Sequence, residues 1–249
     1  MKDVLIVGYG VVGHNLANEI SKVHPDVFDK YKVESNSKRS IKYDIAFICV
    51  DTPLLPNYSL DTSEVENAIN ETDSEIYVIK STCPIGTVDR IKESTGKRII
   101  FSPEYYGGTQ HCNNFSFDFT ILGGNKKDCL EVIQLLQHCY DGRHTFRITD
   151  SKTAELVKFM ENSFLATKVS FCNQFYNICK VHGISYEELR ELFILDERVG
   201  KSHTFVYEES PYWNSHCLNK DVPYIAYSEN ADLLIHVCEF NENQKSGSE

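Results

Sequence analysis

The first half of the chain alternates short apolar runs with segments in which apolar residues recur at helical spacing. Residues 4–7 are uniformly apolar, as expected of a strand that is buried on both faces of a sheet. Further strands are predicted at residues 45–50, 76–81, 98–102, 119–122 and 145–148, and helices between them at 62–70, 87–94 and 126–139. This alternation predicts an α/β fold with a mostly parallel sheet and helices on both of its faces.

The second half opens with a much longer helical pattern, over about residues 153–182. Asp150, Ser151 or Thr153 can cap its start, and Gly183 can end it. At ~1.5 Å per residue such a helix is about 45 Å long, which exceeds the width of a small domain. We therefore expect it to join two bodies or to form a subunit interface, most simply that of a homodimer.

Two domains are predicted from this pattern, an α/β domain at 1–150 and a helical domain at 151–249. The polar residues 241–249 are expected to form a disordered tail. We expect no signal peptide and no membrane anchor, because the longest clean apolar run, residues 45–50, is far too short to cross a bilayer.

Composition narrows the class of protein further. The chain has 249 residues, 41% hydrophobic and 24% charged, which is ordinary for a folded globular protein. A formal charge of −11 argues against nucleic acid as a partner, because binding to phosphates needs a basic surface. Nine cysteines without a C-x-x-C pair indicate neither a disulfide framework nor a zinc site, so no metal is expected. Free thiols favour a reducing, cytoplasmic location.

A glycine motif, Gly8-Tyr9-Gly10-Val11-Val12-Gly13, ends the first predicted strand and opens the first predicted helix. In this context G-x-G-x-x-G binds a dinucleotide, because its glycines let pyrophosphate approach the backbone and let helix and strand pack closely. A second strand is predicted near residues 26–31 and places Asp29 about twenty residues after the glycine motif, where an acid can accept the ribose hydroxyls of NAD. It could instead be a surface carboxylate. Asp29 favours NAD over NADP, although Lys30 and Lys32 weaken this preference.

Polar loops follow three other predicted strands, at residues 50–53, 80–87 and 101–108. Ligands of open α/β sheets bind at the carboxyl ends of the strands, so three such loops predict a ligand site, although each alone could be turn chemistry. Lys158 and Asn162 are four residues apart on the long helix and share one face. They are either a snorkelling lysine beside a surface amide or a catalytic pair in a cleft.

Six motifs in order make the chain resemble the UDP-glucose and GDP-mannose 6-dehydrogenase family over nearly its whole length. They are V-x-T-P at 50–53, K-S-T-x-P-x-G-T at 80–87, S-P-E at 102–104, E-L-x-K-x-x-x-N at 155–162, an R-x-G at 198–200 and C-x-x-K-D at 217–221. The resemblance implies a Rossmann-type domain, a central helix and a small all-helical domain of the 6-phosphogluconate dehydrogenase-like type. It also implies two successive NAD-dependent oxidations of a nucleotide sugar, with UDP-glucose the first to test.

The resemblance also implies roles for individual residues. Cys217 would add to the intermediate aldehyde as a thiolate, and Lys158 with Asn162 would stabilise the oxyanion. Proton transfer and the orientation of water would fall to Asp221, Glu104 and Thr82. Substrate binding would involve Lys158, Asn162, Arg198 and Lys220. NAD would contact Gly8, Gly10, Val11, Val12, Gly13, Asp29, Val50, Thr52, Pro53, Ser81, Thr82 and Glu104.

Three departures from the family pattern leave other functions open. The family's glycine-rich run before the cysteine is Trp213-Asn214-Ser215-His216 here, and Gly108 replaces a second acid. The chain also ends where full-length relatives continue into a second Rossmann-like domain that completes the nucleotide site. The alternatives are a single-step β-hydroxyacid-type dehydrogenase, and an NAD-binding regulatory protein that has lost catalysis.

Overall fold

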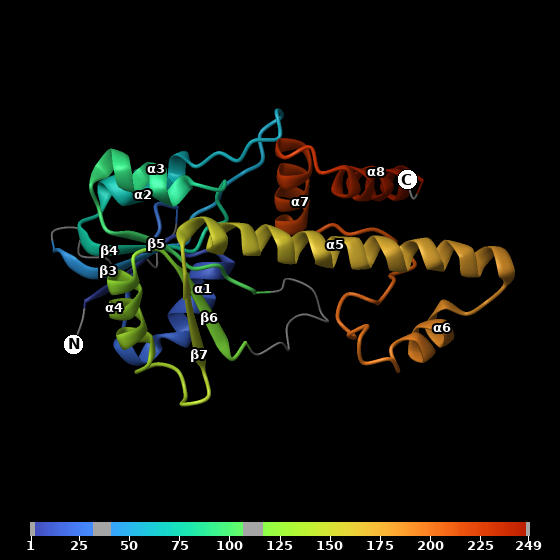
Figure 1. Cartoon of the computed structure of the whole chain (residues 1–249), viewed down its shortest axis with the longest axis horizontal. Helices are drawn as coiled ribbons and strands as arrows, with labels where there is room; N and C mark the ends of the chain where they lie inside the picture. Colours follow the sequence, from blue (N-terminus) through green and yellow to red (C-terminus); the bar gives the residue numbers. More distant parts are fainter. Residues whose placement is uncertain (1–2, 32–40, 107–116, 248–249) are drawn as a thin grey trace. The chain divides into compact units, whose positions relative to one another are not determined.

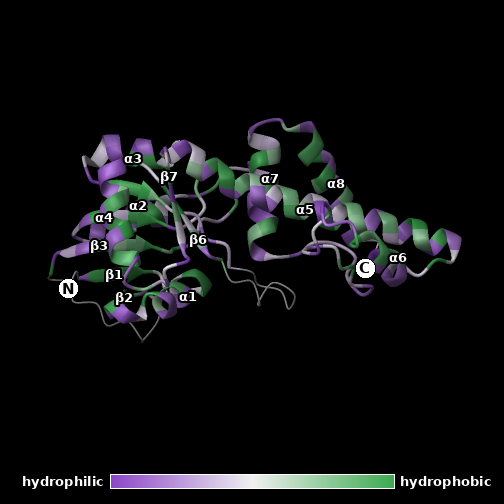
Figure 2. Cartoon of the chain, turned by 60° about the horizontal axis from the view of Figure 1, so that its bottom comes forward, coloured by the Kyte–Doolittle hydropathy of each residue, from purple (hydrophilic) through white to green (hydrophobic). Residues whose placement is uncertain are grey.

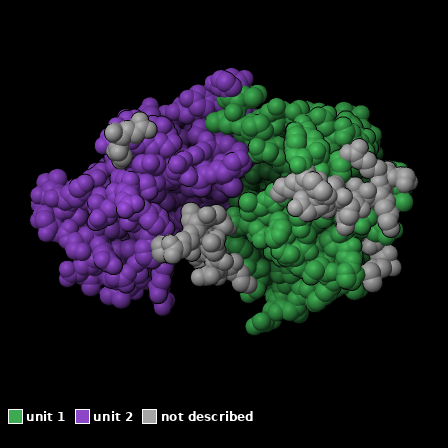
Figure 3. Space-filling view, turned by 180° about the vertical axis from the view of Figure 1, so that it is seen from behind, with its two compact units in different colours: residues 1–55, 60–107, 114–158 green, residues 56–59, 108–113, 159–249 purple. Residues whose placement is uncertain are grey.

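The computed structural model describes residues 3–31, 41–106 and 117–247 of the chain. It forms two compact units, shown in two colours in Figure 3. The N-terminal unit contains residues 1–55, 60–107 and 114–158, and the C-terminal unit contains 56–59, 108–113 and 159–249. The short segment 56–59 therefore groups with the C-terminal unit, where Tyr58 stacks on Tyr227 with their ring centroids 4.1 Å apart.

A seven-stranded sheet forms the centre of the N-terminal unit (Figure 1). Its strands lie in the order β2-β1-β3-β4-β5-β6-β7, and every neighbouring pair is parallel except β5 and β6. The strands are β1 (Val4–Val7), β2 (Asp26–Phe28), β3 (Tyr43–Ile48), β4 (Ser74–Ile79), β5 (Ile99–Phe101), β6 (Phe119–Gly123) and β7 (Thr145–Thr149). The predicted mostly parallel sheet is confirmed.

Helices cover both faces of this sheet. Alternate residues of β1 enter opposite layers, because successive side chains of a strand point to opposite faces. Val4 and Ile6 pack in the layer of α1 (Val11–Glu19) and α4 (Lys126–Leu136). Leu5 and Val7 pack in the layer of α2 (Ser63–Glu71) and α3 (Thr87–Thr95). A short 3-10 turn, η1 (Ser21–Val23), follows α1.

The long helix α5 spans Ser151–His182, as the periodicity predicted to within two residues. Asp150 caps its start, since Oδ1 accepts a hydrogen bond of 2.9 Å from the backbone N–H of Thr153. Gly183 ends it in a left-handed conformation with a φ of 64°. The boundary between the two units falls within this helix, after Lys158.

The C-terminal unit is helical, with α6 (Tyr186–Phe193), α7 (His216–Ser228) and α8 (Asp232–Ser246) beside the distal part of α5. Its core surrounds Trp213, whose indole N–H donates to Ser170 Oγ at 3.1 Å. Residues of α5, α7 and α8 complete that core: Ala166, Leu218, Val222, Ala226, Val237 and Cys238. Within the described ranges, no helix is both long and apolar enough to cross a bilayer.

The expected disordered tail at 241–249 is wrong for most of its length, because α8 continues to Ser246. Asn241 is buried and makes two hydrogen bonds to the backbone of Trp213. Its Oδ1 accepts from the Trp213 N–H at 2.8 Å, and its amide donates to the Trp213 carbonyl at 3.1 Å. A polar residue that pairs with a buried backbone belongs to the core, and composition alone does not reveal such pairing.

Candidate active site

The glycine motif forms a tight turn between β1 and α1. Gly8 has a φ of 90°, and a Cβ atom there would lie 2.5 Å from the carbonyl oxygen of Cys49. A Cβ atom on Gly13 would lie 1.9 Å from the Gly8 carbonyl oxygen. At Gly10, in contrast, a Cβ atom would meet nothing within 4 Å. Gly8 and Gly13 are therefore required by packing, whereas Gly10 leaves open space where a pyrophosphate can approach backbone N–H groups. Val11 and Val12 begin α1 at this point.

Asp29 lies directly after β2, beside the glycine turn. Its Oδ2 accepts a hydrogen bond of 2.7 Å from the Tyr9 N–H, and its Oδ1 accepts one of 2.9 Å from the Tyr31 N–H. These bonds orient the carboxylate that was predicted to bind ribose. The glycine turn, the open space at Gly10 and this oriented acid together fit an adenine dinucleotide.

The loops after β3 and β4 are bonded to each other at the carboxyl end of the sheet. Thr52 Oγ1 donates to the carbonyl oxygen of Thr82 at 2.7 Å, and Ser81 Oγ donates to that of Val50 at 2.6 Å. The Pro53 carbonyl accepts from the Asp61 N–H at 2.9 Å. The structure thus brings together the residues that were predicted from two separate motifs.

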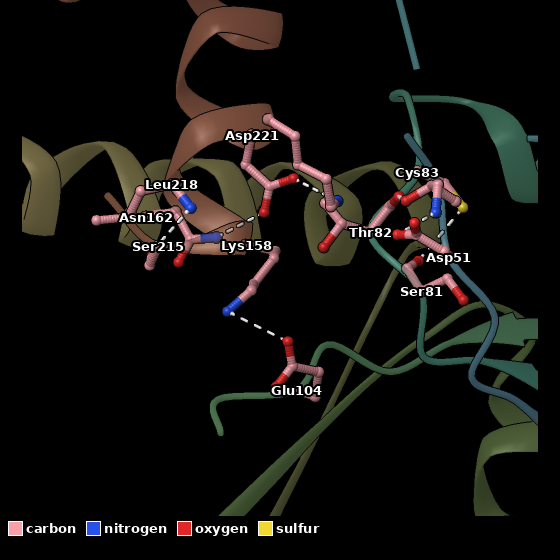
Figure 4. Close-up of polar contacts among 12 residues, drawn as sticks. Asp51, Ser81, Thr82, Cys83, Glu104, Lys158, Asn162, Ser215, Leu218 and Asp221 are labelled. Atoms are coloured by element: carbon pink, nitrogen blue, oxygen red, sulfur yellow. Dashed lines mark hydrogen bonds and ion pairs between the residues drawn. The ribbon is translucent and has the colours of Figure 1, made fainter. Parts of the chain in front are cut away.

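Glu104 and Lys158 form a buried pair in the N-terminal unit (Figure 4). Glu104 follows β5, and its Oε1 lies 3.9 Å from Lys158 Nζ on α5. Its Oε2 accepts a hydrogen bond of 2.8 Å from the Tyr106 N–H, while Lys158 Nζ lies 5.1 Å from the centroid of the Tyr105 ring. A carboxylate and an ammonium group held together away from water can share or transfer a proton during a reaction.

Sequence reasoning missed a second lysine beside this pair. Lys80 is buried, and its Nζ donates to Ser102 Oγ at 3.3 Å and to the Pro103 carbonyl at 3.2 Å. Burial lowers the pKa of Lys80, because the charged form loses its hydration. Its position directly after the apolar run of β4 was the available signal, since a lysine there must either reach solvent or find buried acceptors.

A second polar cluster lies in the C-terminal unit, where Asp221 on α7 meets Asn162 on α5. Asn162 Nδ2 donates to Asp221 Oδ2 at 2.6 Å, and Lys220 Nζ donates to Asp221 Oδ1 at 2.7 Å. Asp221 is 0% exposed and Lys220 is 9% exposed. The structure therefore gives Lys220 a carboxylate partner of its own, and its contact with substrate stays a prediction.

Cys217 lies in the first turn of α7, which begins after the N-cap Ser215. The Ser215 hydroxyl accepts from the Leu218 N–H at 3.2 Å. Cys217 is partly exposed, whereas the other seven cysteines that the structure describes are buried. The partial positive charge at the start of a helix favours the thiolate form of a cysteine. Cys217 is thus the described thiol best placed to act as a nucleophile.

Arg198 lies in the C-terminal unit, in the segment after α6. It is exposed, and its Nε donates to Asp196 Oδ1 at 2.9 Å, a hydrogen bond that also holds the pKa of Asp196 below its usual value. The following loop is held from α5, where Lys168 Nζ donates to the carbonyl oxygens of Val199 at 3.3 Å and Gly200 at 3.1 Å. The predicted contact of Arg198 with substrate stays a prediction.

Two further sequence expectations concern Gly108 and a possible metal site. Gly108, where the family pattern has a second acid, lies outside the described residues. Across the described parts of the chain, no group of three or more His, Cys, Asp or Glu side chains is arranged to hold a metal ion.

A parallel sheet with a glycine turn after its first strand and an acid after its second defines a dinucleotide-binding domain of the dehydrogenase type. The chain belongs to the UDP-glucose/GDP-mannose dehydrogenase family. Residues 11–141 match the model of the family's NAD binding domain, and residues 152–243 match that of its central domain. NAD is accordingly the cofactor of the N-terminal unit.

Similar proteins agree with this assignment. UDP-glucose 6-dehydrogenase of Rickettsia bellii is 27% identical over 230 residues, which cover 83% of this chain and 52% of that protein. UDP-glucose 6-dehydrogenase AglM of Haloferax volcanii is 29% identical over 246 residues, with coverages of 87% and 56%. This chain thus spans about half the length of the curated relatives it matches.

The fold also matches a solved structure. A UDP-glucose dehydrogenase from the hyperthermophilic archaeon Pyrobaculum islandicum gives a TM-score of 0.80 at 21% identity. The match covers 99% of this chain and 68% of that chain. At this level of identity the likeness shows a shared fold.

Proposed function

We propose that this chain oxidises the primary alcohol of a nucleotide sugar to a carboxylate in two NAD-dependent steps, with UDP-glucose as the first substrate to test. Membership of the family supports the class of reaction. The observation that carries the proposal is the pair of buried polar clusters that share α5, Lys158 with Glu104 and Asn162 with Asp221. Buried charges are costly, and clusters of them are typical of active sites.

Lys158 and Asn162 lie four residues apart on α5, and side chains at this spacing project from the same side of a helix. In the first step Glu104 takes the proton of the alcohol, while Lys158 and Asn162 donate to the oxygen on which charge develops. An NAD molecule held by the glycine turn and Asp29 would accept one hydride, so two NAD molecules would be used in succession, one for each oxidation. The product of the first step is an aldehyde.

In the second step the Cys217 thiolate adds to the aldehyde carbon, and the new C–S bond gives a thiohemiacetal. A base such as Glu104 takes the hydroxyl proton of this thiohemiacetal, its carbon gives a hydride to the second NAD, and a thioester remains. Water then attacks the thioester, the C–S bond breaks, and the carboxylate and the free thiol are released. Asp221 is suited to orient this water, because each carboxylate oxygen keeps a free acceptor direction beside its bond to Lys220 or Asn162.

A rapid-quench assay with UDP-glucose tests the proposal by measuring NADH and uronate together. We expect two NADH per uronate for the wild type. Cys217→Ser should slow acid formation severely and keep substrate binding, because a hydroxyl of nearly the same shape is a far poorer nucleophile at neutral pH. Cys139→Ala, which removes a thiol at the end of α4, serves as the control.

Three outcomes would overturn parts of the proposal. Equal uronate production by wild type and Cys217→Ser excludes covalent catalysis. One NADH per turnover without acid indicates a single-step dehydrogenase of the β-hydroxyacid type. A chain that binds NAD but turns over no nucleotide sugar is a regulatory or binding protein.

A homodimer built on α5 and α6 belongs to the same proposal. Large apolar side chains along these helices are exposed in the single chain: Met160, Phe164, Phe171, Phe175, Ile178, Val181, Leu192 and Phe193. Figure 2 shows hydrophobic bands recurring along α5. Three of these residues, Phe164, Phe171 and Phe193, line a cavity of about 220 Å³. A contiguous exposed apolar surface of this kind is typical of a protein interface.

Sedimentation at micromolar concentration tests the dimer. Phe171→Asp should shift the protein to monomer, whereas Lys180→Asp, at an exposed position nine residues further along and therefore on the opposite side of the same helix, should not. A wild-type protein that sediments as a monomer would contradict the proposed dimer. The two-step reaction is tested separately, by the rapid-quench assay.

A further inference from the structure

Glu155 caps helix α3 from a distant part of the chain. Its Oε2 accepts a hydrogen bond of 2.6 Å from the Gly86 N–H, and its Oε1 accepts one of 2.9 Å from the Val88 N–H. Gly86 is the N-cap of α3, has a φ of 90° and offers no side chain to cap the helix. The fully buried carboxylate of Glu155 therefore takes the place of a local N-cap side chain.

A second contact fastens the same two helix ends. Asp89, in the first turn of α3, accepts a hydrogen bond of 2.7 Å from Ser151 Oγ at the first residue of α5. Lys152 Nζ lies 4.0 Å from the other oxygen of Asp89. The start of α5 is thus bonded to the start of α3 by buried and half-buried groups, all within the N-terminal unit.

The two fastened segments carry residues of the candidate active site. The loop at 80–86, which leads into α3, contains Thr82, and Thr52 Oγ1 donates to the Thr82 carbonyl. Lys158 lies three residues after Glu155 on α5, and its Nζ is 3.9 Å from Glu104 Oε1. A displacement of α3 relative to α5 would therefore move Thr82 away from the lysine.

We propose that Glu155 is a positioning residue of the active site, whose carboxylate holds the Thr82 loop and the Lys158 turn in one fixed arrangement. In this role Glu155 acts on Thr82 and Lys158 indirectly, through its hydrogen bonds to the backbone N–H groups of Gly86 and Val88. Its effect on turnover rests on the function proposed above, whereas its effect on the loop does not.

The charge of Glu155 gives this contact a pH dependence. Burial raises its pKa to about 7, against the lowering effect of the two backbone N–H groups. Of the charged groups that act on it, Asp89 on α3 raises its pKa and Lys152 on α5 lowers it. Above about pH 7 both oxygens accept. Below it one oxygen carries a proton and becomes a donor, so that one of the two N–H groups loses its acceptor.

Amide hydrogen exchange at Gly86 and Val88 tests the contact in the whole chain without any need for turnover. A bond to a charged acceptor is worth ~1.5–3 kcal/mol, so Glu155→Gln should raise the exchange rate at one or both amides by about ten- to a hundredfold. In the wild type the protection factor of the same amide, which corrects the rate for the pH dependence of intrinsic exchange, should fall by a similar factor as the pH falls from 8 to 6. Glu93→Gln, an exposed substitution of the same kind on α3, should change neither amide.

The second readout is the pH profile of NAD binding and, where turnover is found, of kcat. The wild type should lose rate or affinity below about pH 7, and Glu155→Gln should show a lower value without that inflection. If Glu155 had only a structural role, Glu155→Gln would lower the stability of the protein but leave the shape of its pH profile unchanged, and this result would overturn the proposal. Unaltered exchange at both amides would overturn it as well. A wild type without turnover whose exchange still follows pH would refute the proposed function and support the role of Glu155 in holding the loop.

Discussion

The carboxylate of Asp221 offers a quantitative test of the C-terminal cluster, because both of its oxygens are bonded inside the protein. Lys220 Nζ donates to one oxygen at 2.7 Å, and Asn162 Nδ2 donates to the other at 2.6 Å. Asp221→Asn keeps the shape of the side chain and removes its charge. The new amide can accept from one neighbour only, and Lys220, which is 9% exposed, loses its counter-ion.

The structure sets the size of the expected loss. Removing one partner of a buried ion pair costs ~3–5 kcal/mol, because the other charge stays buried and unpaired. We expect about 3 kcal/mol, the lower end of this range, because the long stem of Lys220 lets its ammonium group turn toward water. Lys220→Met should cost a similar amount. The double variant removes both charges of this pair, so it should be more stable than the sum of the two losses predicts, by at least ~1.5 kcal/mol.

The single tryptophan of the chain makes the assay specific for this unit. Trp213 is buried in the same core as Leu218 and Val222 of α7, so its fluorescence during chemical denaturation reports the unfolding of the helix that carries Asp221. Asp232→Asn, at an exposed position in the first turn of α8, should change the free energy of unfolding by less than ~0.5 kcal/mol. Additive single losses would refute the coupling between Asp221 and Lys220.

Three further predictions concern single side chains. Asp29→Ala should weaken NAD binding roughly ten- to a hundredfold, since a charge-assisted bond is worth ~1.5–3 kcal/mol, and unchanged affinity by calorimetry would remove Asp29 from the site. Iodoacetamide should modify Cys217 before the buried thiols such as Cys49, whose pKa burial raises to about 12; mass spectrometry identifies the modified peptide. Because burial raises the pKa of Glu155 from 4.5 to about 7, its ionisation costs more in the folded than in the unfolded chain, so its contribution to the free energy of unfolding is complete below pH 4.5 and is lost as the pH rises through 7. The charged form, which accepts from both N–H groups, therefore holds the start of α3 at a cost in global stability. The free energy of unfolding of wild type relative to Glu155→Gln, followed by circular dichroism, should therefore fall by about 3 kcal/mol between pH 4.5 and 7.5; equal pH dependence would contradict it.

Periodicity predicted the sheet and the long helix well, because each of these elements is stabilised by a face that the sequence itself reveals. The strands at the centre are buried on both faces, and α5 combines a buried side with a clear N-cap at Asp150 and a stop at Gly183. Spacing along the chain was equally informative for Asp29. Asp29 follows β2 and lies beside the glycine turn, because the parallel neighbours β1 and β2 finish at the same edge of the sheet.

Contacts between distant segments could not be read in this way. Glu155 was noted only as the first residue of the motif at 155–162, and the fold shows that its carboxylate caps α3, 67 residues away in the sequence at Val88. Asn241 appeared to begin a polar tail, yet it pairs with the backbone of Trp213. Lys80 gave no sign of its buried acceptors. In all three cases at least one partner is a backbone group, whose position depends on the fold and leaves no trace in residue identity.

The three glycines of the nucleotide turn provide a last test, because the structure gives them different reasons to be glycine. Gly8→Ala would place a Cβ atom 2.5 Å from the Cys49 carbonyl oxygen at a φ of 90°, so it should destabilise the fold by more than the ~1–3 kcal/mol of backbone strain alone. Gly10 has a φ of −74° and open space around it, so Gly10→Ala should leave stability unchanged or raise it by ~0.4–1 kcal/mol.

Packing within the protein therefore does not require a glycine at position 10. Gly10→Ala is for this reason a test of the cofactor site itself. If pyrophosphate lies against the backbone at this turn, the added methyl group occupies its space, and NAD affinity should fall at least tenfold, or ~1.4 kcal/mol, in a fully folded protein. Thermal unfolding and calorimetry on the same sample separate the two effects. A Gly10→Ala protein that binds NAD as tightly as the wild type would show that the dinucleotide does not lie against this turn, whatever the motif suggests.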